Sequence, residues 1–385
     1  MPAASQELIR NINNNLILES IFNFGPISRA DLSKKLKLTK ATISTIVQGL
    51  IDDSLVIEIG SKDTHVGRKP ILLTFNQKCG YAISIDLGVK YISVYLSDLK
   101  GNKIYSSQYK NNLNSKNLLE KLKAIIKHTL TLVPNSKYGV VGISIGIHGI
   151  VHDNEIIFTP YYNLTELNLA SDLENAFKVP VYIENEANLS VIGEKTFCYD
   201  YSNIVSVSIH TGVGLGLVIN NKLYEGSNGF AGEFGHSIVV PDGKLCPCGN
   251  KGCLDQYVSE TALLKEYSKL KGMEIKDIDA LISDYLYGDL DANNIIKSFI
   301  DYTSIGINNI LNIFNPDIII INSSVTTYLP NIIDKIKGSI SNRMSKFINI
   351  VPTTLQDNSI LLGGAYVVTK NFLKIDNLVL GSKYD

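Results

Sequence analysis

The chain has 385 residues and a net charge of −1, with 45% hydrophobic and 19% charged residues. This composition excludes long disorder and collagen-like repeats, and the length suits two or three domains. No apolar run approaches the ~18–20 residues of a membrane helix, and the polar start lacks the apolar core of a signal peptide. We therefore expect a cytoplasmic protein with no membrane partner.

The N-terminal part is predicted to be a winged helix-turn-helix. Apolar residues at helical spacing predict a helix over 12–22, and Ser28 and Thr39 are suitable N-caps for two further short helices. The apolar stretches 55–59 and 71–75 then predict a β-hairpin around a polar tip. Three helices followed by such a hairpin are typical of a DNA-binding module.

Charge and residue type are compatible with DNA binding by this module. Residues 1–75 contain 9 Lys and Arg against 7 Asp and Glu, whereas the remainder contains 27 against 30. In such modules the second helix of the motif enters the major groove, and a basic strip at the hairpin can reach the minor groove. The alternatives are a winged helix used for protein contact and solvated charges at a domain boundary. The candidate DNA-binding residues are Ser28, Arg29, Thr39, Lys40, Ala41, Thr42, Ser44, Thr45, Arg68 and Lys69.

From about residue 80 the pattern changes to alternating strands and helices, which predicts an α/β architecture of two related lobes. The predicted strands are 81–87, 91–97, 103–109, 139–147, 181–184, 204–210, 216–220 and 317–321, with helices over 116–132, from 186, and within 260–313.

Three of the five cysteines cluster in sequence and predict a metal site. Together with a preceding histidine they form the pattern H-x9-C-x-C-x4-C. Three thiolates and one imidazole make a closed tetrahedral set, which suits structural Zn²⁺ rather than a catalytic ion. The alternative is a group of free thiols in a surface loop. Cys79 and Cys198 are expected to be buried thiols. The predicted metal ligands are His236, Cys246, Cys248 and Cys253.

Two segments carry a family resemblance. Residues 231–236 (AGEFGH) and 246–255 (CPCGNKGCLD) closely resemble the signature of the ROK family of repressors and sugar kinases. The resemblance implies an actin-like, two-lobed sugar-kinase fold over 77–385, behind a winged helix-turn-helix over 1–76. Members with a winged helix in front are transcriptional repressors. The pairing is most similar to the branch that controls xylose operons, with regulators that respond to glucose or N-acetylglucosamine as relatives.

The kinase motifs of the family are altered in this chain. Val89 and Lys90 stand where the first phosphate loop has glycine and threonine, and His210 stands where the second has glycine. Asn322-Ser323-Ser324 replaces a Gly-Gly pair of the nucleoside region. Glu186 replaces the catalytic aspartate of the family and is one methylene longer. The extra methylene would misplace the catalytic base, although the carboxylate could still accept hydrogen bonds from sugar hydroxyls. We therefore expect no ATP binding and no enzymatic activity.

The sugar-contacting positions are better retained. His236 is expected to hold zinc through one ring nitrogen and to face a sugar hydroxyl with the other. Asp255 stands where the family usually has glutamate. By resemblance the sugar-binding residues are Gly149, Asn163, Asn185, Glu186, Glu233, His236 and Asp255.

These expectations favour a sugar-responsive repressor that binds palindromic operator DNA as a homodimer or higher oligomer and is released by xylose. The alternatives are a repressor responding to glucose or N-acetylglucosamine, and an ATP-dependent sugar kinase supported by Glu186 and the retained Asp86-Leu87-Gly88.

Overall fold

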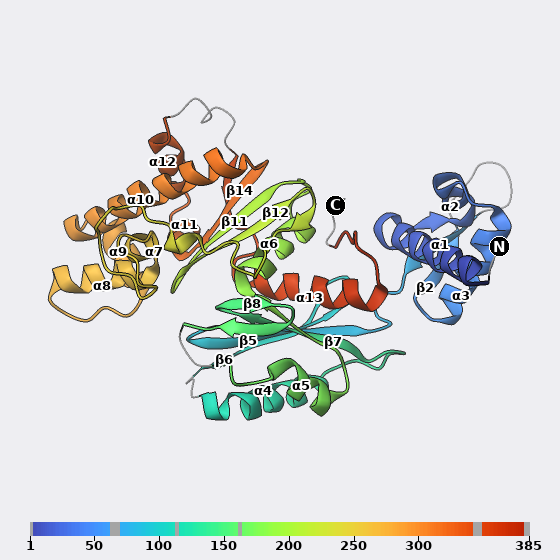
Figure 1. Cartoon of the computed structure of the whole chain (residues 1–385). Coiled ribbons are helices and arrows are strands. Elements are labelled where there is room, and N and C mark those ends of the chain that lie inside the picture. Colours follow the sequence, from blue (N-terminus) through green and yellow to red (C-terminus); the bar gives the residue numbers. More distant parts are fainter. Residues whose placement is uncertain (1–2, 62–69, 112–114, 161–163, 342–348, 381–385) are drawn as a thin grey trace. The chain divides into compact units, whose positions relative to one another are not determined.

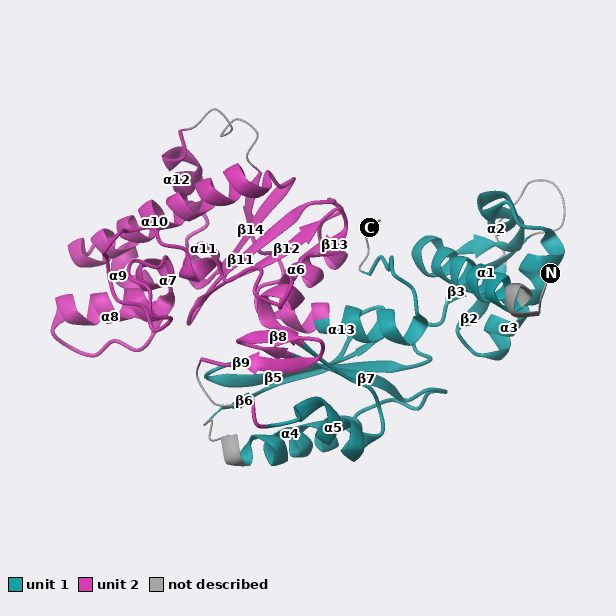
Figure 2. Cartoon of the chain, in the orientation of Figure 1, with its two compact units in different colours: residues 1–145, 167–183, 364–385 teal, residues 146–166, 184–363 magenta. Residues whose placement is uncertain are grey.

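The computed structural model describes residues 3–61, 70–111, 115–160, 164–341 and 349–380 (Figure 1). The chain divides into two compact units, unit 1 with residues 1–145, 167–183 and 364–385, and unit 2 with residues 146–166 and 184–363 (Figure 2). The winged helix groups with unit 1 in this division, and the predicted boundary after residue 76 stays a prediction. Among the described residues, no helix combines the length and hydropathy needed to cross a membrane.

The predicted winged helix is confirmed and includes one additional short strand. It comprises α1 (Ala3–Phe24), β1 (Ile27–Ser28), α2 (Arg29–Leu36), α3 (Lys40–Asp52), β2 (Val56–Ser61) and β3 (Ile71–Phe75). The strands form an antiparallel sheet in the order β1-β3-β2. Apolar residues of the helices and of β3, including Ile21, Ile43 and Leu73, are fully buried and form its core.

The two helices of the motif begin at their predicted caps. The hydroxyl of Ser28 accepts from the backbone N–H of Asp31 at 3.1 Å and donates to its carboxylate at 2.7 Å. Thr39 Oγ1 accepts from the N–H of Thr42 at 3.2 Å. These bonds satisfy N–H groups that have no partner inside the helix, which fixes where α2 and α3 start.

A five-stranded sheet forms the rest of unit 1, in the order β10-β7-β4-β5-β6, with antiparallel pairing of β4 to β5 and of β5 to β6. Both faces of β4 are buried. The elements are β4 (Tyr81–Leu87), β5 (Tyr91–Asp98), β6 (Lys103–Lys110), α4 (Ser115–Leu130), β7 (Val140–Ile147), α5 (Leu169–Phe177) and β10 (Val181–Asn185). The last residues of β7 and β10 belong to unit 2.

Unit 2 contains a second five-stranded sheet in the order β13-β12-β11-β14-β15, with β14 parallel to both β11 and β15. A large cluster of buried residues, including Val207, Phe299 and Ile321, joins this sheet to α10. The strands are β8 (Ile150–His152), β9 (Glu155–Phe158), β11 (Ile204–Ile209), β12 (Val213–Ile219), β13 (Lys222–Leu223), β14 (Ile318–Ser323) and β15 (Ile350–Pro352). The helices are α6 (Glu186–Phe197), the 3-10 helix Phe234–His236, α7 (Asp255–Val258), α8 (Glu260–Lys271), α9 (Ile278–Leu286), α10 (Leu290–Phe314), α11 (Ser324–Tyr328) and α12 (Ile332–Ser339). Helix α13 (Asn358–Leu373) begins in unit 2 and ends in unit 1.

Candidate functional site

The four predicted metal ligands converge on one point of unit 2. Nδ1 of His236 lies 3.5 Å from Sγ of Cys246, and the Sγ atoms of Cys248 and Cys253 are 3.6 Å apart. The four ligand atoms all lie within 4.8 Å of one another. Ligands on a tetrahedral zinc ion with Zn–S bonds of about 2.3 Å lie about 3.8 Å apart, so the cluster fits such an ion.

The backbone of this segment brings the sulfur atoms together. Ile238 forms an antiparallel bridge with Cys253, which folds the segment back on itself. Gly252 has a φ of +82°, and a Cβ at this position would lie 1.7 Å from the carbonyl oxygen of Val240. Only glycine fits both conditions, so Gly252 allows the ligand-bearing loop to pack closely against the backbone of Val240. Outside the cluster, Cys79 is buried as expected, whereas Cys198 is only partly buried at the end of α6.

A cavity of about 250 Å³ lies within unit 2. Its lining comes from the β8–β9 hairpin, the start of α6, the loop between β11 and β12, segment 229–236 and α7. Six of the residues predicted to bind sugar line it, namely Gly149, Asn185, Glu186, Glu233, His236 and Asp255. The seventh, Asn163, lies outside the described residues.

Asn185 uses its side chain to position Glu186. Its Oδ1 accepts from the N–H groups of Ala187 at 2.8 Å and of Asn188 at 3.0 Å, which caps α6. Its Nδ2 donates to the carbonyl of Gly149 and to Oε2 of Glu186, both at 2.8 Å. The amide therefore holds the carboxylate of Glu186 at the cavity, in addition to the sugar contact that the sequence predicts for it.

His148 is a lining residue that the sequence analysis missed. Its Nδ1 lies 4.0 Å from Oε1 of Glu186. Beside it, Gly149 has no room for a side chain, since a Cβ would lie 2.2 Å from the carbonyl oxygen of Phe158. The β8–β9 hairpin therefore packs directly against the backbone at this wall of the cavity.

His236 connects the metal cluster to the cavity. While its Nδ1 faces Cys246, its Nε2 lies 3.7 Å from Oε2 of Glu233. Asp255 accepts from the N–H of Val213 at 3.0 Å, so it also anchors the loop before β12. Burial raises the pKa of Glu233 and of Asp255, and His236 opposes this rise in both. The two ring nitrogens of His236 therefore face the cysteine cluster and Glu233, and the predicted contact with a sugar hydroxyl stays a prediction.

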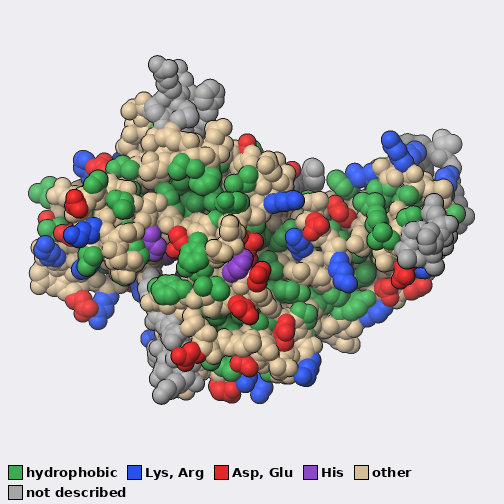
Figure 3. Space-filling model, in the orientation of Figure 1, with side chains coloured by type: hydrophobic (Ala, Val, Ile, Leu, Met, Phe, Trp, Pro, Cys, Tyr) green, Lys and Arg blue, Asp and Glu red, His purple; other side chains and the backbone are tan. Residues whose placement is uncertain are grey.

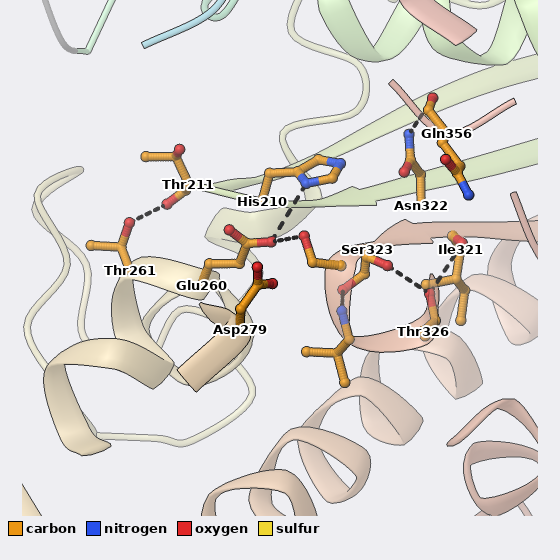
Figure 4. A network of polar contacts seen from close by, with 12 residues as sticks. His210, Thr211, Glu260, Thr261, Asp279, Ile321, Asn322, Ser323, Thr326 and Gln356 are labelled. Carbon is orange, nitrogen blue, oxygen red and sulfur yellow. Dashed lines mark hydrogen bonds and ion pairs between the residues drawn. The ribbon is translucent and has the colours of Figure 1, made fainter. Parts of the chain in front are cut away.

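The lining residues His210 and Thr211 belong to a polar network built around Glu260 (Figure 4). Oε1 of Glu260 lies 3.7 Å from Nδ1 of His210 and accepts from Oγ of Ser324 at 2.5 Å. Thr261 donates to the carbonyl of Thr211 at 2.8 Å, which fixes the same loop. Glu260 was not singled out in the sequence, because no motif connects it to residues 50 positions away.

The candidate DNA-binding residues differ in how far their side chains are exposed to solvent. Lys40, Ala41, Ser44 and Thr45 are exposed on α3. Ser28 is only 3% exposed and its hydroxyl is used for capping, so we remove it from the candidate DNA surface. Basic side chains also lie over α2 (Figure 3).

Among the remaining candidates, the side chains of Arg29, Thr39 and Thr42 form contacts within the winged helix. Arg29 pairs with Glu58 at 2.8 Å, and Thr39 caps α3 and contacts Oγ1 of Thr42 at 2.9 Å. Arg68 and Lys69 lie outside the described residues.

Comparison with known proteins gives matches over nearly the whole chain. The sequence profile described as the ROK family matches residues 82–371. A xylose repressor of Bacillus spizizenii is 39% identical over 384 residues, which cover 97% of this chain and 99% of the relative. A xylose repressor of Bacillus subtilis is 38% identical over 383 residues, with the same coverage.

Solved structures agree with these matches. A ROK family transcriptional regulator, described as a homologue of the Escherichia coli MLC protein, has a TM-score of 0.79 at 27% identity and covers 97% of this chain and 98% of its own. A ROK family glucokinase from Streptomyces griseus, solved with glucose and AMPPNP, has a TM-score of 0.67 at 24% identity and covers 75% and 99%. The second likeness shows a shared fold alone.

Proposed function

The chain belongs to the ROK family, and from this premise we propose that it is a transcriptional repressor that responds to a sugar, with xylose as the favoured effector. The observation that carries the proposal is a winged helix joined in one chain to a cavity lined by the residues predicted for sugar binding. Relatives that match almost end to end and are named xylose repressors support both the regulatory role and the choice of sugar.

The chemistry of the cavity suits a neutral sugar. Carboxylates of Glu186, Glu233 and Asp255 supply acceptors for several hydroxyl groups. Hydrogen bonds to ionised groups are among the stronger ones in proteins, so a small polyol gains affinity from each carboxylate that it reaches. An anionic ligand would be repelled by the same groups. Glucose and N-acetylglucosamine remain the competing effectors. They differ from a pentose in carrying a sixth carbon, so the room in the cavity around that carbon determines whether a hexose or a pentose is bound.

We propose operator DNA as the macromolecular partner, bound by a homodimer or a higher oligomer. The exposed residues at the start of α3 would meet the major groove, with Lys40 on a phosphate and Ala41 beside a base edge. A twofold operator requires two such modules. Release by sugar requires that the operator-binding and released states differ in their sugar affinity.

A structural Zn²⁺ ion would be held by His236, Cys246, Cys248 and Cys253. The ion would supply a fixed anchor for the loop, because three thiolates and an imidazole leave no open position for a substrate. His236 would then have its tautomer set by the metal, and its second nitrogen would be oriented toward the cavity. The metal therefore supports sugar binding without taking part in chemistry.

The competing function is an ATP-dependent sugar kinase, which the fold shared with the glucokinase and the carboxylate of Glu186 favour. We infer that the chain lacks this activity. Val89 and Lys90 replace phosphate-loop residues, and the carboxylate of Glu260 beside His210 adds negative charge where a polyphosphate would have to approach the second loop.

The test measures binding of the chain to a DNA fragment from upstream of neighbouring sugar genes. Fluorescence anisotropy at fixed salt is the readout. Each titration is run without ligand and with xylose, glucose or N-acetylglucosamine. Tight, specific binding released by xylose supports the proposal, and release by another sugar replaces the effector. Weak binding that ignores sequence and falls steeply with salt would overturn it, and sugar-dependent ADP formation from ATP would favour the kinase.

A further inference from the structure

Helix α13 starts beside the cavity. Ile360 in its first turn lines the cavity, and the hydroxyl of Ser359 lies 3.0 Å from that of Ser190 on α6. Helix α6 itself begins with Glu186, the candidate sugar ligand. The first turn of α13 is therefore in contact with the helix that carries a group expected to bind sugar.

The contact between α6 and α13 has little freedom to slide. A Cβ on Gly193 of α6 would lie 2.2 Å from the carbonyl oxygen of Ser359, and a Cβ on Gly363 would lie 1.9 Å from that of Leu189. The two backbones therefore touch at both glycines. Since packed interiors are dense and transmit displacement, a shift of α6 has to be followed by the first turns of α13.

At its other end, α13 contacts Tyr138, which is bonded to the end of α3. The ring of Phe372 packs edge-on against Tyr138, with centroids 5.1 Å apart. Tyr138 donates its hydroxyl to the carbonyl of Asp53 at 2.8 Å, and Lys137 donates to the carbonyl of Asp52 at 2.9 Å. These carbonyls end α3 and have no partner within the helix, so the two donors fasten the C-terminal end of α3.

Residues 374–380, called here the C-terminal segment, fasten the winged helix at a second place. Asn23 near the end of α1 donates to the carbonyl of Asn377 at 2.7 Å and accepts from the N–H of Val379 at 2.8 Å. Lys100 donates to the carbonyl of Phe22 at 2.7 Å, with its ammonium 3.6 Å from the centre of that ring. Leu380 of the segment is fully buried.

We infer that α13 and the C-terminal segment connect the sugar cavity to the winged helix, with Tyr138 and Asn23 as positioning residues that set the orientation of α3. This inference rests on the proposed function, because it names the route by which sugar changes operator binding. The covalent continuity of α13 from Ile360 to Phe372 is its basis: one end lines the cavity and the other contacts Tyr138. The C-terminal segment that follows α13 accepts the hydrogen bond from Asn23. Without these attachments, the module would bind the operator equally well with and without sugar.

The test compares the chain with the variant Asn23→Ala/Tyr138→Phe, which removes the bonds to Asn377, Val379 and Asp53. Phenylalanine keeps the ring contact with Phe372. The matched control is Asn371→Ala/Tyr285→Phe, which removes an intrahelical bond of α13 and a surface bond to Lys335. Three quantities are measured for each: sugar affinity by calorimetry, operator affinity without sugar, and operator affinity with saturating sugar.

We expect sugar to change operator affinity by about 5- to 150-fold in the unmodified chain and in the control. In the test variant the ratio of operator affinity without sugar to operator affinity with sugar should fall below about threefold, while sugar affinity is retained. An unchanged ratio, or equal weakening of operator binding with and without sugar, would show a merely structural role and overturn the inference. If the unmodified chain shows no sugar effect, the proposed function itself fails. Should the double variant not fold, Phe372→Leu weakens the same contact and is judged by the same ratio.

Discussion

His236 and Glu233 face each other across the boundary between the metal cluster and the cavity, with Nε2 of the imidazole 3.7 Å from Oε2 of the carboxylate. The opposite nitrogen, Nδ1, is directed at Cys246. A metal ion on Nδ1 requires that nitrogen to be unprotonated, so Nε2 carries the hydrogen and becomes a donor toward Glu233 or a sugar hydroxyl. Under the proposed function, metal binding and sugar binding would thus depend on the same imidazole ring.

The first prediction follows from this shared ring. Cys248→Ser should lose the bound metal and lower sugar affinity by at least about tenfold, because loss of an anchoring ligand loosens the loop that orients His236. Operator affinity without sugar should change by less than about threefold, since α3 makes no use of the cluster. Metal analysis, calorimetry and DNA anisotropy measure the three quantities. Cys198→Ser is the matched control, and a metal-free variant with full sugar response would contradict the prediction.

The second prediction concerns Glu186. Glu186→Gln keeps the shape of the side chain but removes its charge, so hydrogen bonds from sugar hydroxyls lose their ionised acceptor. Such bonds contribute about 1.5–3 kcal/mol and bonds to a neutral amide about 0.5–1.5 kcal/mol, so sugar affinity measured by calorimetry should fall about 5- to 15-fold. Glu155→Gln on the exposed part of β9 is the control. Unchanged affinity would remove Glu186 from the sugar site.

The third prediction concerns Lys40 at the start of α3. Lys40→Ala should weaken binding to specific and unrelated DNA alike, and the slope of log affinity against log salt should become shallower by about 0.9, as expected for one lost phosphate contact. Lys269→Ala on α8 is the control. A variant with an unchanged salt slope would show that Lys40 does not neutralise a phosphate.

Sequence reasoning succeeded where the decisive signals are local. The caps Ser28 and Thr39 act on N–H groups three residues ahead, and a metal loop brings its cysteines together by short spacing and glycines, so both features follow from neighbouring residues.

Long-range packing could not be predicted in this way. The bond from Asn23 to the backbone of Asn377 joins residues 354 positions apart, and the approach of Glu260 to His210 depends on the contact between the start of α8 and the loop after β11. No periodicity or cap marks such pairs. The same reason explains why the contact of His148 with Glu186 was missed.

The fourth prediction concerns the pH dependence of stability. Burial raises the pKa of Glu184 from 4.5 to about 7, and the charges of Glu225 and Glu186 add to the rise against bonds from Asn188 and the N–H of Asn185. Between these values the folded chain keeps the proton and the unfolded chain has lost it. The unfolded state then binds fewer protons, so the free energy of unfolding falls as the pH rises through this window.

Glu184→Gln should remove this dependence. Urea unfolding at about pH 5 and about pH 8 should show that the unmodified chain loses more stability across the interval than the variant does, by no more than about 3 kcal/mol. Equal losses in the two proteins would show that Glu184 is ionised in the folded chain at the lower pH.

The last prediction concerns the wall of the cavity at Gly149. A Cβ there would lie 2.2 Å from the carbonyl oxygen of Phe158 and 3.0 Å from Cγ2 of Thr159, so the β8–β9 hairpin has to shift in Gly149→Ala. Overpacking of this kind costs about 1–3 kcal/mol of stability, and the shift displaces the carbonyl to which Asn185 donates. The carboxylate of Glu186 then loses its support, and sugar affinity should fall with stability.

Gly338→Ala is the matched control, because nothing lies within 4 Å of a Cβ at that position in α12. Alanine favours a helix over glycine, so this variant should be as stable as the unmodified chain or slightly more stable, with sugar affinity unchanged. Thermal unfolding and calorimetry on both variants separate the two effects. If Gly149→Ala bound sugar as tightly as the control, the close backbone approach at Phe158 would be irrelevant to the cavity, and Asn185 would hold Glu186 without help from the hairpin.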